Sequence, residues 1–260
     1  MFILTLGSTD PFFNLSAEEY LLREKSEDFF LLWQNEPCIV IGRNQNAADE
    51  INGDYVRTRS LPVVRRMTGG GAVYHDRGNL NFSFIAGSER YDQDRQLRLI
   101  LEAVRALGIP CEATGRNDLA VEGRKFSGNA FCKRSKVKQH HGTLLVASDL
   151  DQLQKYLRVD PRKLRSKGTK SVRSRVCNLS DFLPGLRVEA LLEALRSDFS
   201  GQEALRQRLI HKSPKYGNDK PYVDDMLYDW EQWFCEDMPH KFESLYAEPL
   251  YVCQMSVSTH

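Results

Sequence analysis

Three consecutive glycines between two apolar runs constrain the fold of this chain more than any other short feature. Residues 69–71 follow the run PVVRRMT and precede the run AVYHD. Glycine adopts positive φ without steric cost, so the triplet predicts a tight turn with bare backbone N–H groups between two strands. Such N–H groups form a concave site for an anion, and Arg65 or Arg66 would add charge and bidentate geometry. The stretch predicts a phosphate-binding loop, and a flexible hairpin linker with surface arginines is the alternative.

Several further apolar runs have the length and composition of strands. FFLLW and CIVIGRN are separated by a polar Gln-Asn-Glu-Pro turn, which predicts a strand–turn–strand unit. NLNFSFI alternates apolar and polar residues, with Leu80, Phe82 and Phe84 on one face. GTLLVAS indicates another strand, and DLAVEGRKFSGNAF indicates a hairpin that turns at Glu122 and Gly123.

Helices are expected between these groups of strands. Ser16 and Glu19 have the spacing of a capping box, which would open a helix through about Lys25. DRQLRLILEAVRALG has apolar residues at helical spacing and stops at Gly108, and DLDQLQKYL indicates a shorter helix. Runs of strands with helices between them predict an α+β or mixed α/β fold with a largely antiparallel sheet.

Two charged residues flank the turn of the predicted hairpin. Asp118 starts its first strand, and Lys125 begins the second directly after the turn. A lysine beside a hairpin turn usually only solvates the surface. The functional alternative is that Lys125 points inward and holds a carboxylate or phosphate as a compact point charge.

The composition of the chain changes towards its C-terminus. Residues 155–175 contain nine Lys or Arg and one acid, whereas from Pro214 onward nine acids face three lysines. The basic stretch indicates either a solvated loop or a loop that closes over a negatively charged intermediate. Without interleaved aromatic residues it gives little support to nucleic-acid binding. We expect a domain boundary around residues 197–210.

The overall composition indicates a cytoplasmic globular protein. A net charge of +1 gives no bias towards nucleic acid or membranes, and no apolar run approaches the roughly 20 residues that span a bilayer. The N-terminus lacks a basic region and a cleavage site, so no signal peptide is expected. Six cysteines without a C-x-x-C pair favour free thiols in a reducing compartment, and no metal site is expected.

Four stretches taken together resemble the lipoate–protein ligase family. They are RRMTGGGAVYHDRGNLNFSF, GRNDLAVEGRKFSGNAF, HHGTLLVASDLDQLQKYL and SKGTKSVRSRVCNLSDF. The resemblance runs from about residue 1 to 195. It implies the biotin/lipoate ligase catalytic fold, related to class II aminoacyl-tRNA synthetases, with a mixed and mostly antiparallel sheet and flanking helices.

The resemblance also implies a reaction in two steps. Ligases of this family use ATP with Mg²⁺ to convert lipoate to lipoyl-AMP and pyrophosphate. They then transfer the lipoyl group to one lysine of an apo lipoyl domain of a 2-oxoacid dehydrogenase complex, or of the glycine-cleavage H protein. A separate accessory subunit is a further partner in some members, and neither nucleic acid nor a membrane is expected.

The family's functional residues carry over to matching positions of this chain. Lys125 and Asp118 are expected to be catalytic. The ATP contacts are expected from Arg66, Gly71, Ala72, Val73, Tyr74 and Lys125. The acyl-substrate contacts are expected from Lys125, Thr68, Gly70, His75, Gly128 and His141. The loop that closes over the adenylate is expected to contain Lys167, Gly168, Ser171, Val172 and Arg175.

The chain departs from the family after about residue 197. We expect residues 1–197 to form the catalytic domain, and residues 198–260 resemble a fragment of a glycyl radical enzyme of the pyruvate formate-lyase group instead of the usual accessory domain. Two alternatives to an ATP-dependent ligase follow. One is a transferase that uses preformed lipoyl-AMP or a lipoylated donor, and the other is a non-catalytic protein that binds the acyl-adenylate. Cys177 raises the alternative of a thioester route, although a small structural residue is favoured there.

Overall fold

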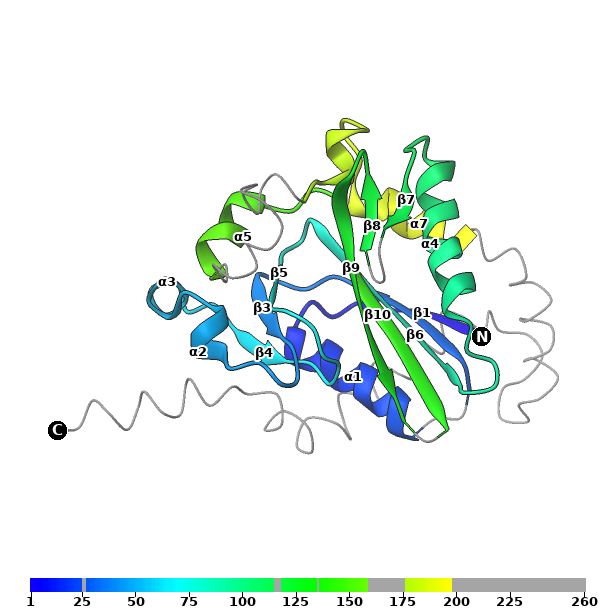
Figure 1. Ribbon diagram of the computed structural model, residues 1–260, viewed down its shortest axis with the longest axis horizontal. Helices are drawn as coiled ribbons and strands as arrows, with labels where there is room; N and C mark the ends of the chain where they lie inside the picture. The colour runs from blue at the N-terminus through cyan, green and yellow to red at the C-terminus, as the bar shows by residue number, and fades with distance from the viewer. Residues whose placement is uncertain (25–26, 115–117, 135, 159–175, 198–260) are drawn as a thin grey trace.

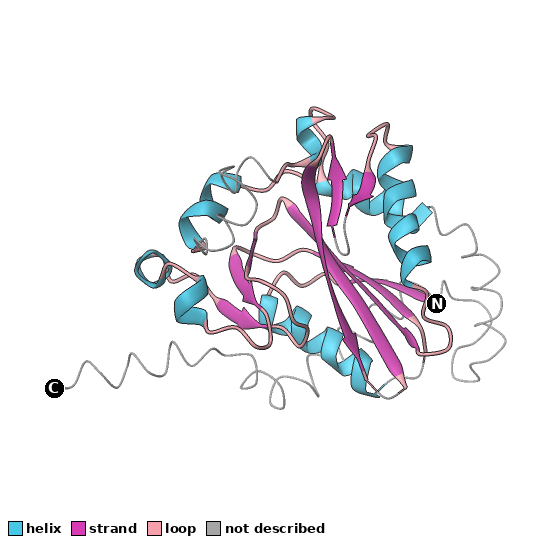
Figure 2. Ribbon diagram, viewed as in Figure 1, coloured by secondary structure: helices cyan, strands magenta, loops and turns pink. Residues whose placement is uncertain are grey.

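A seven-stranded, mostly antiparallel sheet forms the centre of the protein (Figures 1 and 2). The computed structural model describes residues 1–24, 27–114, 118–134, 136–158 and 176–197. In the sheet only the first pair of strands is parallel. From edge to edge the strands are β1 (Phe2–Thr5), β2 (Phe29–Trp33), β6 (Asn79–Gly87), β10 (Val137–Leu145), β9 (Arg124–Lys133), β8 (Asp118–Val121) and β7 (Glu112–Thr114).

A second sheet of three short strands lies beside the first (Figure 1). Its central strand β3 (Cys38–Ile41) pairs in parallel with β4 (Val63–Arg65) and antiparallel with β5 (Val73–His75). The predicted strand–turn–strand unit is confirmed, and its two strands β2 and β3 belong to different sheets. The turn between β2 and β3 is held by the segment before α1, because the backbone N–H of Glu36 donates to the carbonyl of Thr9 over 2.8 Å.

Helix α1 (Pro11–Glu24) begins six residues earlier than the capping-box pattern predicts. The carboxylate of Asp10 accepts a hydrogen bond from the backbone N–H of Phe12 over 2.9 Å, and proline is favoured in the first turn of a helix. Ser16 is buried inside the helix, where its hydroxyl has no hydrogen-bond partner in the described part of the chain, and Glu19 pairs with Arg23. The capping-box prediction is wrong because a stronger start signal precedes it.

Helices cover both faces of the large sheet. As predicted, Leu80, Phe82 and Phe84 of β6 share one face, where they pack in a single cluster with α4 (Gln93–Ala106) and α7 (Val188–Ser197). Helix α1 packs on the opposite face through an apolar cluster that includes Leu21 and Ile85. Helix α4 ends before Gly108, which adopts a φ of +85°.

The small sheet has its own cover of short helices. Its apolar face packs against α2 (Ala47–Glu50), α3 (Gly53–Thr58) and α5 (Leu150–Tyr156). In this cluster the ring of Tyr74 stacks on that of Tyr156 with centroids 5.2 Å apart. A 3-10 turn (Leu179–Asp181) precedes α7. None of the helices in the described ranges is both long and apolar enough to cross a membrane.

Candidate active site

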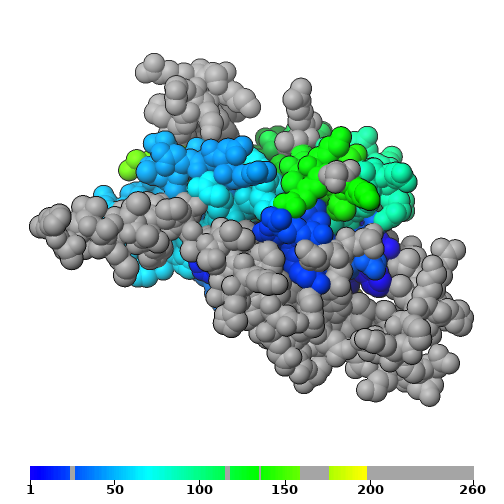
Figure 3. All heavy atoms as spheres, turned by 90° about the horizontal axis from the view of Figure 1, so that it is seen from below, coloured from blue at the N-terminus to red at the C-terminus, as the bar shows by residue number. Residues whose placement is uncertain are grey.

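A cavity of about 210 Å³ opens where the glycine loop between β4 and β5 meets strands β9 and β10. Seen from below, the cyan surface of the first segment adjoins the green surface of the second (Figure 3). Leu15, Trp33, Val40 and Ala130 contribute apolar surface to the cavity. Two cations also line it, Arg66 and Lys125. A cavity that is apolar on part of its wall and cationic elsewhere suits an elongated apolar molecule with an anionic end.

Arg66 holds the glycine loop in place. Arg66 is 7% exposed, and its guanidinium donates from Nη2 to the carbonyls of Gly69 and Gly71, over 2.7 and 2.8 Å. It also donates from Nη1 to the carbonyl of Val40 over 3.2 Å and from Nε to the hydroxyl of Thr68 over 3.0 Å. Burial lowers the pKa of Arg66 to about 10, so the side chain keeps its charge at neutral pH. The arginine therefore fixes the loop and leaves a buried positive charge beside the cavity.

Of the three glycines, only Gly70 uses a conformation that favours glycine. Its φ is +96°, and a Cβ added there would lie 2.8 Å from Nη2 of Arg66. The backbone approaches closely here too, since a Cβ on Gly42 would lie 2.2 Å from the carbonyl oxygen of Gly70. Strands β4 and β5 both pair with β3 rather than with each other. The segment is thus a held loop and not a hairpin linker.

Strand β5 presents alternate residues to the cavity. Val73 and His75 line it together with Ala72, whereas Tyr74 points away into the core of the small sheet. Any contact of Tyr74 with a ligand in the cavity would therefore use its backbone. Burial lowers the pKa of His75 to about 3, helped by the nearby charges of Arg66 and His141, so His75 is neutral at physiological pH.

A buried chain of side chains supports Arg66 from behind. The carboxylate of Glu18 lies 2.9 Å from Nδ1 of His141, and Nε2 of His141 lies 2.6 Å from the hydroxyl of Thr68, which accepts from Arg66. His141 lines the cavity, whereas Thr68 is buried behind it. Because a carboxylate only accepts, Nδ1 of His141 donates to Glu18, and Nε2 accepts from Thr68 when the ring is neutral. These hydrogen bonds connect Arg66 to three segments of the protein and orient its side chain.

The β8–β9 hairpin brings the second cation to the cavity. Its turn is tight, with positive φ at Glu122 and Gly123, as predicted. Nζ of Lys125 lines the cavity and lies 2.7 Å from the carboxylate of Asp118, and their side chains are 38% and 46% exposed. Asp118 itself does not line the cavity. A Cβ on Gly128 would lie 3.1 Å from Nζ of Lys125, so residue 128 leaves room for the lysine.

The residues expected to close over the adenylate lie outside the described residues: they are Lys167, Gly168, Ser171, Val172 and Arg175. The chain after them is anchored at the cavity, because Val176 pairs with Lys125 and the N–H of Cys177 donates to the carbonyl of Lys125 over 2.9 Å. Cys177 is fully buried, and burial raises the pKa of its thiol to about 11. A buried protonated thiol is a poor nucleophile, which argues against a thioester route.

Several polar residues of the cavity were not expected from the sequence. Asn35, Asn81, Asn129 and Thr143 line it. A signal for Asn81 exists in NLNFSFI, where polar residues alternate with the apolar face; Asn81 is 2% exposed and donates to the carbonyl of Trp33 over 3.3 Å. Within the described ranges, no group of three or more His, Cys, Asp or Glu side chains could hold a metal ion.

Comparisons with known protein families divide the chain in two. Residues 10–200 match the model of the lipoyl protein ligase A/B catalytic domain. Residues 185–260 match a pyruvate formate lyase-like model, as the sequence predicted. The first match covers most of the chain and all of the cavity's described walls.

Similar proteins agree with the first match. The lipoate–protein ligase 1 of Staphylococcus aureus is 46% identical over 248 residues, which cover 93% of this chain and 75% of the relative. A bi-partite lipoate protein ligase from Thermoplasma acidophilum, studied with its E2 lipoyl domain, is 28% identical with a TM-score of 0.67, over 95% of this chain and 97% of that one. A lipoate–protein ligase A bound with ATP is 26% identical with a TM-score of 0.66, over 93% and 98% of the two chains. The fold is that of the lipoate ligase catalytic domain, and the chain belongs to the lipoate–protein ligase family.

Proposed function

We propose that this protein uses ATP to convert lipoate to lipoyl-AMP and then transfers the lipoyl group to a lysine of an apo lipoyl domain. One observation carries the proposal: a single cavity combines an apolar wall with the buried charge of Arg66 and the half-exposed ammonium of Lys125. The relatives whose names specify lipoate and ATP support it.

In the first step the lipoate carboxylate attacks the α-phosphorus of ATP, and pyrophosphate leaves. This brings two anions together, so fixed positive charge must offset their repulsion. Lys125 can leave Asp118 and contact the carboxylate and the phosphate together, since its side chain is 38% exposed. The N–H groups around Gly70 and Gly71, held in shape by Arg66, would face the phosphate.

In the second step the amine of the acceptor lysine attacks the acyl carbon of lipoyl-AMP. The amide bond forms, the bond to phosphate breaks, AMP leaves, and the amine loses a proton. Lys125 would stabilise the oxyanion. The carboxylate of Asp118, which lies 2.7 Å from Nζ of Lys125, is the one placed to receive the proton. The step needs no covalent intermediate on the enzyme, in keeping with the protonated thiol of Cys177.

Mg²⁺ is proposed to enter with the nucleotide. Mg²⁺ is usually held by one or two carboxylates together with substrate phosphates rather than by a cage of protein ligands. The half-exposed Asp118 fits this requirement. When bound, the ion would neutralise part of the phosphate charge.

The acceptor and the location of the protein are also proposals. We infer that the acceptors are apo lipoyl domains of 2-oxoacid dehydrogenases and the H protein, and that a separate accessory subunit can assist, as the word "bi-partite" suggests for the Thermoplasma protein. The scattered cysteines favour the cytoplasm. We also propose that residues 198–260 form a second unit. The match to the Staphylococcus relative covers 93% of this chain, and residues 198–260 make up more than the remaining 7%. The match therefore extends into them.

The proposal is tested by the intact mass of an apo lipoyl domain after incubation with this protein, Mg-ATP and lipoic acid. A gain of one lipoyl group that requires ATP is the expected result. No gain with ATP or with lipoyl-AMP would contradict the proposal and favour a protein that only binds the adenylate.

A transferase that uses preformed lipoyl-AMP is the second candidate. It is favoured by the match of residues 185–260 to a pyruvate formate lyase-like model where the family's accessory domain is expected. Such a protein would lipoylate the acceptor from supplied lipoyl-AMP but would not exchange labelled pyrophosphate into ATP. A ligase would do both.

A further inference from the structure

His75 lines the cavity, and one of its ring nitrogens is buried without a partner among the described residues. The residue is 5% exposed, and its Nε2 atom is buried without a hydrogen-bond partner among the described residues. The other ring nitrogen, Nδ1, lies 3.0 Å from the side-chain nitrogen of Asn35. A neutral imidazole has one N–H and one acceptor nitrogen. The partner of Nδ1 therefore decides whether His75 offers the cavity a donor or an acceptor.

The polarity of this contact follows from Asn14. Its side-chain nitrogen faces three acceptors, the carbonyls of Ser8 and Gln34 at 3.0 and 3.2 Å and Oδ1 of Asn35 at 2.9 Å. Backbone carbonyls only accept, so the NH2 group of Asn14 must point at them. An NH2 group of Asn35 placed 2.9 Å from that of Asn14 would set donor against donor, so Asn35 turns its oxygen to Asn14 and its own NH2 group towards His75. Nδ1 of His75 accepts, and the proton is left on Nε2.

We propose that Asn14 and Asn35 are positioning residues that lock His75 in the tautomer with its proton on Nε2. His75 then donates from Nε2 to an acyl oxygen of the substrate. That atom is a carboxylate oxygen before activation and the carbonyl oxygen of the adenylate afterwards. Only the identity of this acceptor rests on the proposed function, because the tautomer is a property of the protein alone.

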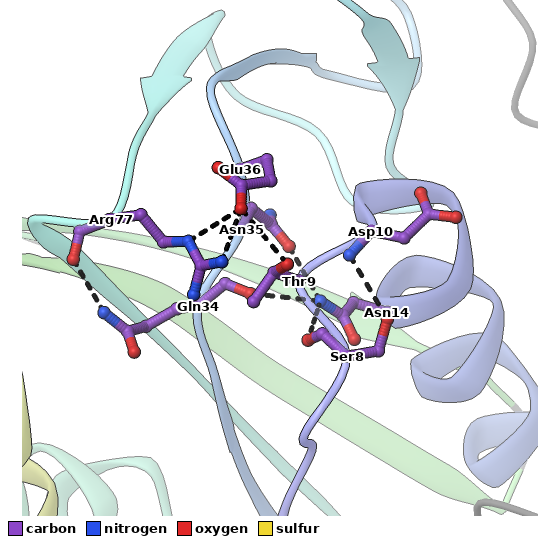
Figure 4. A network of polar contacts seen from close by, with 8 residues as sticks. All are labelled: Ser8, Thr9, Asp10, Asn14, Gln34, Asn35, Glu36 and Arg77. Carbon is purple, nitrogen blue, oxygen red and sulfur yellow. Dashed lines mark hydrogen bonds and ion pairs between the residues drawn. The ribbon is translucent and has the colours of Figure 1, made fainter.

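The surrounding polar network holds Asn14 and Asn35 in place. Both are fully buried, at the start of α1 and directly after β2. Figure 4 shows how the turn that contains Asn35 is tied to its neighbours. Gln34 donates from its side chain to the carbonyl of Arg77 over 2.6 Å, and the guanidinium of Arg77 pairs with Glu36. The turn after β2 is thus fastened to the residues just beyond His75.

The charges around His75 suit a neutral donor. Arg66 follows β4, and Lys125 and His141 line the same cavity from β9 and β10. The nearby charge of Arg66 disfavours an imidazolium, and so does burial. A neutral imidazole N–H can donate to a carboxylate without adding a third positive charge to those of Arg66 and Lys125.

The tautomer can be measured directly by 15N NMR of the whole protein labelled at histidine, with His75→Gln used for assignment. We expect His75 to be protonated at Nε2 and bare at Nδ1 between pH 5.5 and 8.5. A proton on Nδ1, or an imidazolium in that range, would overturn the proposal. Added lipoate should shift the Nε2 signals of His75. Saturating lipoate that leaves them unmoved would overturn the donation step. If lipoate does not bind at all by calorimetry, the proposed function fails instead.

The variant Asn35→Asp should move the proton. A carboxylate at residue 35 can still accept from Asn14, but it also accepts from Nδ1 of His75 and raises the pKa of the ring. Above that pKa the bare Nε2 would face the substrate. We expect kcat/KM for lipoyl-AMP formation to fall roughly 10- to 100-fold at high pH, the effect of losing one hydrogen bond to a charged group, with partial recovery as pH is lowered.

Glu36→Gln is the matched control, because it breaks the exposed pair with Arg77 in the same turn and leaves the contact between Asn35 and His75. It should keep the wild-type tautomer and a wild-type pH profile. An Asn35→Asp protein with the wild-type rate and profile would refute the positioning role. If that variant does not fold, the tautomer of the unaltered protein decides the question.

Discussion

Arg66 and Lys125 line the same cavity, but the protein holds them in opposite ways. Arg66 is 7% exposed and donates to backbone carbonyls of the glycine loop and of Val40. The side chain of Lys125 is 38% exposed and pairs with the half-exposed Asp118. An arginine fixed in this way shapes the site before any substrate arrives. A lysine with one exchangeable partner is free to follow the reacting group. We therefore propose that Arg66 stabilises the glycine loop and supplies a fixed positive charge, and that Lys125 acts on the reacting group.

The largest effect is expected from replacing Lys125. Lys125→Ala should lower the rate of lipoyl-AMP formation roughly 100- to 1,000-fold, because it removes the charge that stabilises the transition state. The melting temperature should barely change, since the lysine is half-exposed. Pyrophosphate exchange measures the rate. Lys133→Ala, at the exposed end of the same strand, is the control and should behave as wild type. A normal rate for Lys125→Ala would contradict the assignment.

The arginine side should respond first in stability. Arg66→Met leaves the carbonyls of Val40, Gly69 and Gly71 without their donor. We expect the free energy of unfolding to fall by about 2–4 kcal/mol, as for buried acceptors left unsatisfied. Urea unfolding checks this, with Lys125→Ala as the comparison that should lose little. Equal stability of the two variants would remove the distinction drawn between the cations.

The buried histidines make stability depend on pH. Burial lowers the pKa of His75 and that of His140 to about 3, whereas an unfolded histidine titrates near 6.5. Below about pH 6.5 the unfolded chain binds protons that the folded protein does not. The free energy of unfolding should therefore fall as pH is lowered towards 3, by roughly 1.4 kcal/mol per pH unit for each histidine. Urea unfolding of wild type and His140→Gln at pH 7, 6 and 5 should show a shallower slope in the variant. Identical slopes would mean that His140 titrates alike in the folded and the unfolded chain.

A smaller effect should separate two neighbouring glycines of the arginine side. Gly70→Ala forces a side chain into a φ of +96° and against Arg66, at a cost of about 1–2 kcal/mol. Gly69→Ala meets no atom within 4 Å and should be tolerated. Thermal unfolding of both variants measures the difference. Equal losses would show that the shape of the loop does not depend on Gly70.

The smallest effect is expected next to the lysine. Cys177→Ser should keep the wild-type rate of lipoyl transfer, because the thiol is buried and protonated rather than poised as a nucleophile. Its cost in the free energy of unfolding should be about 1 kcal/mol, the usual size for one substitution. The intact mass of the lipoyl domain gives the rate. Loss of transfer by a folded variant would reopen the thioester route.

Local patterns predicted the parts of the fold whose causes are local. The turn at Glu122 and Gly123, the alternation in β6 and the end of α4 before Gly108 all follow from neighbouring residues and are confirmed. The partner of β2 could not be read in this way, because its register with β6 joins residues about 50 positions apart. The start of α1 was missed because two competing start signals lie six residues apart, and burial of Ser16 decides between them.

The same distinction applies to the cavity. Sequence motifs pointed to the glycine loop and to Lys125, and the structure places both at one cavity. Asn14 and Asn35 were missed because asparagine is ordinarily a surface residue. Their importance comes from being fully buried between segments that are distant in sequence, which no local pattern reports.

The pairing of Lys125 with Val176 and Cys177 has a consequence for how the protein is made. A chain emerges from the ribosome in order, and the cavity's glycine loop and Lys125 are both synthesised well before residue 176. The segment that braces Lys125 from behind, and α7 with Leu191 and Leu195 against α4, arrive last among the described elements. A nascent chain therefore carries most of its cavity residues while the part of α4 that packs against α7 is still uncovered. Ribosomal stalling before α7 should therefore yield an aggregation-prone intermediate.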